Sequence, residues 1–337
     1  HILIQNRIFM KKLRISTSLY LFIPFCLFVF LGLAGMAVMT GCSSADGSGT
    51  SVKVVRLDHA FRDGRPFADG LAAPAEALFQ VSGYGSLNDS SYAAYMANPS
   101  VRVHESAVDS LWGDTRRLES QLGGVKARYA RLFPDKSFPS VYAVISPFRQ
   151  SVFTVDTFLY VGLNHYLGED YPPYGYFPDY MRVRKIPARV VPDIVEALLH
   201  RDFPYAPAAD YPTVLSRLLY EGALVESVMQ LAGISEQTAL GYDDRQMDWL
   251  NKNEHKLWEV IVGRKYLFSS DRQLASSLTA QAPFTSAIGP EVPGGAGRFI
   301  GHRIVASLLD NRAVALSVLL SPSFYESPDA LAESKYK

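Results

Sequence analysis

The side chains best suited to chemistry lie on two neighbouring helix-forming stretches in the middle of the chain. Glu196 and His200 are four residues apart in the stretch that opens at Pro192, and Glu221 lies in the next stretch. Zinc peptidases place two histidines one helical turn apart, a glutamate beside the first histidine, and a third ligand on a later helix. The spacing of these three residues therefore points to the chemistry of a zinc-dependent hydrolase.

The ligand set is incomplete in either register. If Val195 stands at the first histidine position, Glu196 remains as the base and both histidines are missing. If His200 is the second histidine, Glu196 replaces the first one and Ala197 replaces the base. Because neither register keeps more than two ligands, we predict a remnant metal site without metal at Glu196, His200 and Glu221, and no catalytic residue or cofactor. A zincin-type metallohydrolase with these non-standard ligands is the alternative.

Other motifs for catalysis or cofactor binding are also incomplete. His104-Glu105 is followed one turn later by Val108 instead of a second histidine. The glycine-rich segment 294–301 lacks the Lys-Ser/Thr pair of a phosphate-binding loop. Both cysteines, Cys26 and Cys42, lie near the N-terminus, so the rest of the chain cannot form a disulfide, a thiolate zinc site or a cysteine nucleophile.

Composition excludes two broad classes of protein. Hydrophobic residues make up 48% of the 337 residues and charged residues 20%, which predicts a sizeable core and excludes global disorder. Lys+Arg and Asp+Glu number 33 each. A protein that holds a polyanion usually has a basic excess, so we expect no nucleic-acid partner.

The N-terminal segment has the pattern of a bacterial lipoprotein signal. Met10 is the first plausible start, and Lys11, Lys12 and Arg14 follow it before an apolar run over 19–39. The run ends at Met39-Thr40-Gly41-Cys42, which resembles a lipobox with methionine at its first position. We therefore predict that residues 1–41 are upstream residues and signal peptide, and that Cys42 carries the lipid. An uncleaved transmembrane anchor is the alternative, since the run is long enough to span a bilayer.

The residues after Cys42 indicate how the anchor is used. Residues 42–51 read as a lipidated cysteine and a flexible tether rich in Ser and Gly. Ser43 does not suggest retention in the inner membrane, and the tether lacks an acidic run of the kind that resembles a surface-export signal. We expect a protein of the cell envelope, anchored to the outer membrane and facing the periplasm.

The remaining residues, 52–337, predict a single, mostly α domain with a small antiparallel β-sheet. Strands are expected at 52–57, 140–145 and 151–162, the last two as a hairpin. Residues 166–180 predict an ordered aromatic loop whose rings cover the core, with peptide or glycan binding as the alternative. Apolar spacing predicts the helices, which are expected at 72–81, 106–133, 192–200, 213–232, 244–262, 298–309 and 313–320.

Short motifs in a fixed order resemble the gliding-motility lipoprotein B family (GldB) of Bacteroidetes. They cover nearly the whole chain after Cys42. The matching stretches are 162–171, 177–181, 218–222, Asn253-Glu254, Leu257-Trp258, 267–271, 282–285, 297–305 and 334–337.

The resemblance implies an envelope lipoprotein and no described catalyst. It also implies a zincin-like helical architecture whose metal residues have degenerated, although Glu221 follows Tyr220 as a ligand of an active relative would. We therefore expect a lipid-anchored protein that works through contacts with envelope proteins of a motility or secretion apparatus.

Overall fold

A four-stranded sheet forms the centre of the N-terminal half of the structure. The computed structural model describes residues 51–146 and 150–337. The strands are β1 (Val54–Arg56), β2 (Ser140–Val144), β3 (Val152–Val155) and β4 (Phe158–Gly162), in the spatial order β1-β2-β4-β3. β1 pairs with β2 and β2 with β4 in parallel, and only β3 and β4 are antiparallel.

The predicted antiparallel sheet and its hairpin are therefore wrong. The hairpin lies inside the stretch 151–162, where Asp156 adopts a positive φ of 52° and divides it into β3 and β4. β2 is buried at Val141–Val144 and pairs with a strand on each side. Its continuous apolar sequence suits a central parallel strand, whereas a half-solvated antiparallel strand would alternate polar and apolar residues.

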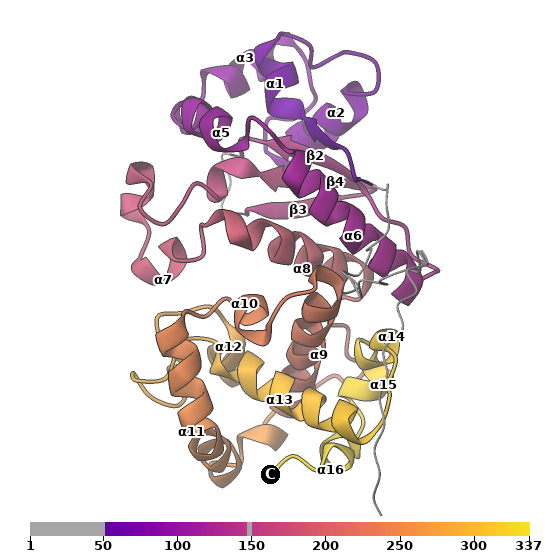
Figure 1. The fold of residues 1–337 in the computed structure, drawn as a ribbon, viewed down its shortest axis with the longest axis vertical. Helices are drawn as coiled ribbons and strands as arrows, with labels where there is room; N and C mark the ends of the chain where they lie inside the picture. The colour runs from indigo at the N-terminus through magenta and orange to yellow at the C-terminus, as the bar shows by residue number, and fades with distance from the viewer. Residues whose placement is uncertain (1–50, 147–149) are drawn as a thin grey trace, which may run out of the picture. The chain divides into compact units, whose positions relative to one another are not determined.

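Short helices surround one end of the sheet, and a longer helix, α6 (Arg116–Leu132), runs beside it (Figure 1). The stretch 106–133 was expected to form one helix, but it forms α5 and α6, which are separated at Gly113. The carboxylate of Asp114 accepts a hydrogen bond from the backbone N–H of Arg116, at 2.9 Å, and so begins α6. The other helices of this part are α1 (Leu57–Arg62), α2 (Ala72–Val81), α3 (Asp89–Ala97), α4 (Pro99–Arg102) and α5 (Glu105–Trp112).

The C-terminal half consists of helices around α9 (Val214–Ala232), a central helix that is buried along most of its length (Figure 1). α9 begins at Thr213, whose side chain accepts a hydrogen bond from the N–H of Ser216, and ends at Gly233 in the left-handed conformation. The other helices are α7 (Asp179–Arg182), α8 (Val190–Asp202), α10 (Glu236–Leu240), α11 (Asp244–Gly263), α12 (Arg272–Thr279), α13 (Ala296–Asn311), α14 (Leu316–Leu319), α15 (Pro322–Tyr325) and α16 (Ala330–Ser334). The mostly helical class predicted from the sequence is confirmed.

The aromatic segment 166–180 is ordered and contains a short 3-10 helix, η2 (Pro172–Tyr176). Tyr166 and Tyr174 are buried, whereas the Tyr176 side chain is exposed. The rings of Tyr166 and Tyr174 therefore pack into the interior, whereas the ring of Tyr176 does not.

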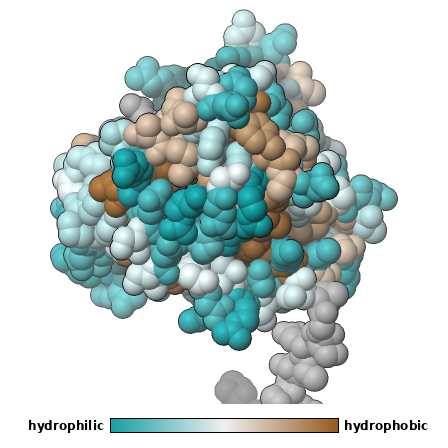
Figure 2. Space-filling view, turned by 90° about the horizontal axis from the view of Figure 1, so that it is seen from above, coloured by the Kyte–Doolittle hydropathy of each residue, from teal (hydrophilic) through white to brown (hydrophobic). Residues whose placement is uncertain are grey.

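The surface seen in Figure 2 has hydrophilic side chains spread across its centre, with hydrophobic ones between them. Within 51–146 and 150–337, every helix is too short or too polar to cross a bilayer. The lipobox and Cys42 lie outside the described residues.

Helices α9 and α13 touch backbone to backbone at two glycines. A Cβ atom added to Gly222 would lie 2.2 Å from the carbonyl oxygen of Gly301, and one added to Gly301 would lie 2.0 Å from the carbonyl oxygen of Leu218. These positions therefore require glycine for steric reasons, because neither helix can accept a side chain at the crossing.

We predict that Gly222→Ala lowers the free energy of unfolding by at least about 2 kcal/mol, since the new methyl group must push two packed helices apart. Gly263→Ala on α11 is the control, because a Cβ there has no neighbour within 4 Å. Urea unfolding of the two variants measures the difference. Equal stability of both variants would show that the helices can separate without cost.

Candidate functional site

The three residues predicted to form a remnant metal site come together around a fourth residue, Arg298. Glu196 and His200 lie one turn apart on α8, Glu221 lies on α9, and Arg298 lies in the first turn of α13. The guanidinium of Arg298 contacts both carboxylates. Its Nη2 lies 2.9 Å from Oε1 of Glu196, and its Nε lies 3.1 Å from Oε2 of Glu221.

This cluster is a buried network of ion pairs. The side chains of Arg298 and Glu221 are 9% and 6% exposed. Arg217, one turn before Glu221 on α9, adds a second cation, with its Nη2 2.6 Å from Oε1 of Glu221. Each carboxylate therefore has an arginine partner, which a buried charge requires.

The pKa values of the cluster follow from this pairing. Burial acts to raise the pKa of Glu196, but the charge of Arg298 and the hydrogen bond with His200 outweigh it, and the pKa lies well below its usual range. Burial acts to lower the pKa of Arg298, but Glu196 and Glu221 outweigh it and raise that pKa. The guanidinium of Arg298 is therefore a charged group held between the carboxylates of Glu196 and Glu221.

His200 lies at the outer edge of this network. Its Nε2 is 3.7 Å from Oε1 of Glu196, and its side chain is 46% exposed. Its Nδ1 is 3.2 Å from the hydroxyl of Tyr220, which itself donates a hydrogen bond to the carbonyl of Phe203. The imidazole is thus held beside Glu196 and open to solvent.

The residues present do not fit a zinc ion between Glu196 and Glu221, because the Arg298 guanidinium lies between those carboxylates. In 51–146 and 150–337, the one group of three or more ligand-type side chains close enough for a shared ion is Asp58, His59 and Asp109. Asp109 in that group is already paired with Arg56 and Arg62. Sequence reasoning missed Arg298, although a charged residue in a helical turn with buried apolar neighbours such as Phe299 was a usable signal.

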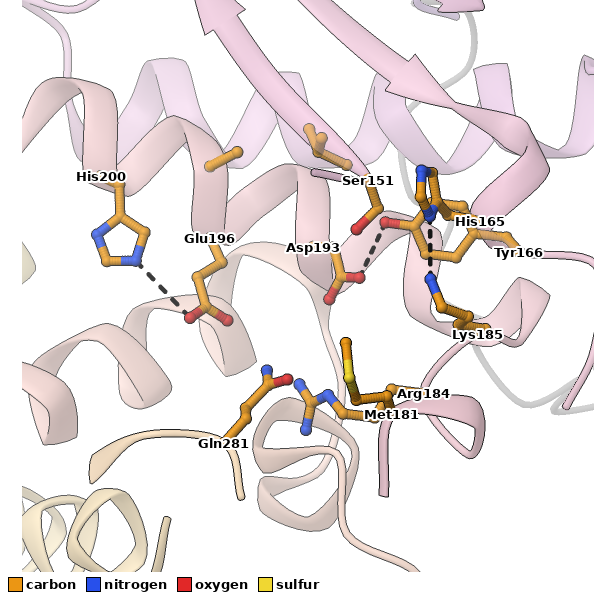
Figure 3. Close-up of a pocket in the computed structure, with 12 residues that line it drawn as sticks. Ser151, His165, Tyr166, Met181, Arg184, Lys185, Asp193, Glu196, His200 and Gln281 are labelled. Carbon is orange, nitrogen blue, oxygen red and sulfur yellow. Dashed lines mark hydrogen bonds and ion pairs between the residues drawn. The ribbon is translucent and has the colours of Figure 1, made fainter. Parts of the chain in front are cut away.

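A polar cavity of about 310 Å³ opens beside this network (Figure 3). Asp193, Glu196 and His200 of α8 form one wall. The other walls come from the start of β3, from η1 (Leu163–His165), from the segment 181–185 and from Gln281. Helix α8 therefore presents one face to both the arginine network and the cavity.

Each acidic residue of the cavity wall has its own arginine. Asp193 pairs with Arg189, one turn earlier on the chain, at 2.6 Å. It also accepts a hydrogen bond from the hydroxyl of Tyr166 at 2.9 Å. Burial, followed by the charge of Asp193, raises the pKa of Tyr166 well above its usual value, so this hydroxyl remains a donor. Glu196 pairs with Arg298, as described above.

Two cations of the same cavity have uncharged partners. Lys185 Nζ lies 2.9 Å from Nδ1 of His165 and 4.3 Å from the centre of the Phe177 ring. Arg184 Nη1 donates to the carbonyl of Leu240 at 2.9 Å. Burial lowers the pKa of Lys185 to about 8 and that of Arg184 to about 10. Sequence reasoning did not single out either residue.

A second buried network lies deeper in the helical half. The imidazole of His302 on α13 has Glu236 Oε1 2.6 Å from Nδ1 and Glu226 Oε2 3.0 Å from Nε2. Both ring nitrogens face carboxylates, so both carry protons. Burial acts to lower the pKa of His302, but the hydrogen bonds with Glu226 and Glu236 outweigh it and raise the pKa above its usual value of 6.5. This imidazolium joins α9, α10 and α13.

Comparison with known proteins gives one match. The model of the family described as "Gliding motility protein GldB" matches residues 44–337. No curated protein and no solved structure matches the chain. The resemblance stated from the sequence motifs is thereby confirmed.

We predict a pH-dependent contribution of His302 to stability. Its pKa is raised in the folded state, so its contribution is fully present below about pH 6.5 and is lost as the pH rises through the folded-state pKa. His302→Gln should lower the free energy of unfolding by about 3 kcal/mol at pH 6, since it leaves the carboxylate of Glu226 without a cation and Glu236 with Arg303 alone. The loss should be smaller at pH 9. Urea unfolding of the wild-type protein and the variant between pH 6 and pH 9 measures the loss. A loss that does not depend on pH would contradict the protonated state of His302.

Proposed function

Because the chain belongs to the family of the gliding motility protein GldB, we propose that it is a lipid-anchored protein of the cell envelope that acts through protein contacts and not through catalysis. The observation that carries this proposal is the position of Arg298 between Glu196 and Glu221. We further propose that it works with proteins of a motility or secretion apparatus.

The position of Arg298 argues against zinc-dependent hydrolysis for a chemical reason. A catalytic zinc ion keeps an open coordination position, where it lowers the pKa of a bound water. A guanidinium supplies positive charge between the carboxylates, but it has no coordination position to offer and cannot activate water in this way. The zincin-type alternative, with Glu196, His200 and Glu221 as ligands, requires Arg298 to leave the space between the two carboxylates.

We propose that residues 1–41 are upstream residues and signal peptide, that residues 42–51 are the lipidated Cys42 and its tether, and that residues 52–337 form one domain. The described chain begins at the surface of α6, where the backbone N–H groups of Val52 and Val54 donate to the carbonyl and the carboxylate of Glu119. If Cys42 is the anchor, the segment from Cys42 to Val52 allows at most about 36 Å between the lipid-bearing residue and this point.

The charge on α6 is consistent with a membrane nearby. Arg117, Lys126 and Arg131 are exposed on this helix, and its one acidic residue, Glu119, is used to hold β1. Basic side chains within a Debye length of an anionic bilayer are each attracted by about 1 kcal/mol. We propose that this side of the domain faces the membrane that carries the lipid, which is the outer membrane viewed from the periplasm.

We predict that Arg298→Ala lowers the free energy of unfolding by about 3 kcal/mol at pH 7, because it leaves Glu196 and Glu221 buried without the cation they share. Arg298→Lys keeps the charge and should lose less. Arg312→Ala is the control on the same helix, because Arg312 forms an exposed pair with Glu333 and should cost under about 1 kcal/mol. Urea unfolding at pH 7 measures all three variants.

Metal analysis of protein purified without chelator distinguishes an envelope protein that acts through contacts from a metallohydrolase. We expect no stoichiometric zinc in the wild-type protein and unchanged stability in chelator. Stoichiometric zinc that disappears in Glu221→Ala, together with hydrolysis of a peptide, would establish the metallohydrolase instead.

We predict that mass spectrometry of the mature protein finds an acylated N-terminus at Cys42, and that Cys42→Ser abolishes acylation and processing. A retained N-terminal segment would support the transmembrane anchor. An unlipidated N-terminus elsewhere would remove the lipid anchor and leave the argument from Arg298 untouched.

A further inference from the structure

Two cationic side chains at the cavity beside α8, Lys185 and Arg184, have no ion-pair partner among the described residues. Its two carboxylates, Asp193 and Glu196, have arginines of their own in Arg189 and Arg298. Within 51–146 and 150–337, neither Lys185 nor Arg184 has a carboxylate oxygen within 4.0 Å, although both line the cavity. Among the residues that the structure describes, these two cations therefore form no ion pair, although Asp193 and Glu196 attract them from a greater distance.

We propose that this cavity binds a ligand through a carboxylate group, which pairs with the ammonium of Lys185. The guanidinium of Arg184, which lines the same cavity and lies beside Gln281, adds to the attraction (Figure 3). This proposal goes beyond the envelope function above, and it does not depend on the lipid anchor or on Arg298.

The buried side chain of Lys185 lines the cavity and has few polar partners. Its side chain is buried, and the rings of Phe177 and Tyr174 lie 4.3 Å and 5.3 Å from Nζ at their centres. Nζ donates one hydrogen bond, to Nδ1 of His165 at 2.9 Å. An ammonium has three donors, so two remain for a group that enters through the cavity. The attraction between this buried ammonium and an anion would be stronger than in water, because the local dielectric constant is low.

Arg184 is fixed in position by neutral oxygens. Nη1 donates to the carbonyl of Leu240, the last residue of α10, and lies 3.4 Å from the carbonyl oxygen of Gly241. With the amide of Gln281 turned so that its oxygen faces the guanidinium, Oε1 accepts from Nε and Nη2 at 3.2 Å each. These contacts hold the charge of Arg184 at the cavity without cancelling it.

The cavity favours a single negative charge over a phosphate. Asp193 and Glu196 line the same space and would repel a dianion more strongly than a carboxylate. A volume of about 310 Å³ is at the small end of ligand pockets and suits a small acid or the last one or two residues of a peptide. The carboxylate is the chemistry that these two sources share.

The experiment uses the whole protein and four probes, namely N-acetyl-glycyl-alanine, its C-terminal amide, propionate and inorganic phosphate. Binding is measured by calorimetry and by reductive methylation of lysines, read out by mass spectrometry. We expect the free acid to bind and to slow methylation of Lys185, whereas the amide does neither. Methylation of the exposed Lys256 on α11 is the internal control and should not change.

Variants test whether Lys185 is the partner. Lys185→Met should weaken binding of the acid at least about tenfold, which corresponds to one charge-assisted hydrogen bond. Lys185→Arg should retain binding, and Lys256→Met should bind as the wild-type protein does. Far-ultraviolet circular dichroism checks that each variant is folded. The methylation experiment needs no variant, so it decides the question if Lys185→Met does not fold.

The outcomes of the binding experiment are independent of the tests of the proposed function. Binding of the peptide acid alone supports a peptide C-terminus, and binding of propionate alone supports a small acid. Equal binding of acid and amide, stronger protection by phosphate, or unchanged binding in Lys185→Met would each overturn the proposal. None of these results bears on acylation of Cys42 or on the metal content.

Discussion

The backbone contact between α9 and α13 is the constraint on which the helical half depends. Gly222 and Gly301 let the two helices approach until a Cβ on one would overlap a carbonyl of the other. Glu221 precedes the first glycine, and Arg298 lies three residues before the second. Close packing of the backbones thus brings a carboxylate and a guanidinium from distant parts of the chain within 3.1 Å.

The buried charges depend on this packing. Removing ions from water costs several kcal/mol each, and the attraction between them compensates only when the geometry is good. Arg298 meets this requirement with Glu196 on one side and Glu221 on the other, and His302 meets it one turn later with Glu226 and Glu236. One helix therefore carries two cations into a buried region, each matched by two carboxylates. The resulting network ties α8, α9, α10 and α13 to one another.

The cavity beside α8 differs from these networks in one respect. In the networks each arginine and histidine lies against a carboxylate, whereas Lys185 and Arg184 have hydrogen-bonding and aromatic partners but, within 51–146 and 150–337, no carboxylate oxygen within 4.0 Å. Stability alone gives no reason to keep two such cations at a cavity, because an apolar residue would avoid the cost of burying charge. An unmatched charge at a solvent-connected cavity is more easily explained by recognition of a ligand.

The sequence by itself determined the elements whose signals are local. Apolar spacing predicted α2, α9 and α11, and the order of short motifs predicted the family. The sequence also placed Glu196 and His200 together, because an i, i+4 spacing puts two side chains on one helical face, and it added Glu221 from the ligand pattern of zinc peptidases. The pairing of β2 with β4 could not be predicted, since parallel partners are chosen by contacts between segments far apart in the chain.

The tertiary structure alone decided what the group of three residues is. Arg298 is about 80 to 100 residues from Glu221 and Glu196 in the sequence, and no local pattern links them. Only the crossing of α9 and α13 puts a guanidinium between the two carboxylates and so makes the cluster an ion-pair network. The sequence could not single out Lys185 and Arg184 either. Whether a charged side chain has an ion-pair partner depends on its neighbours in space, which only the fold determines.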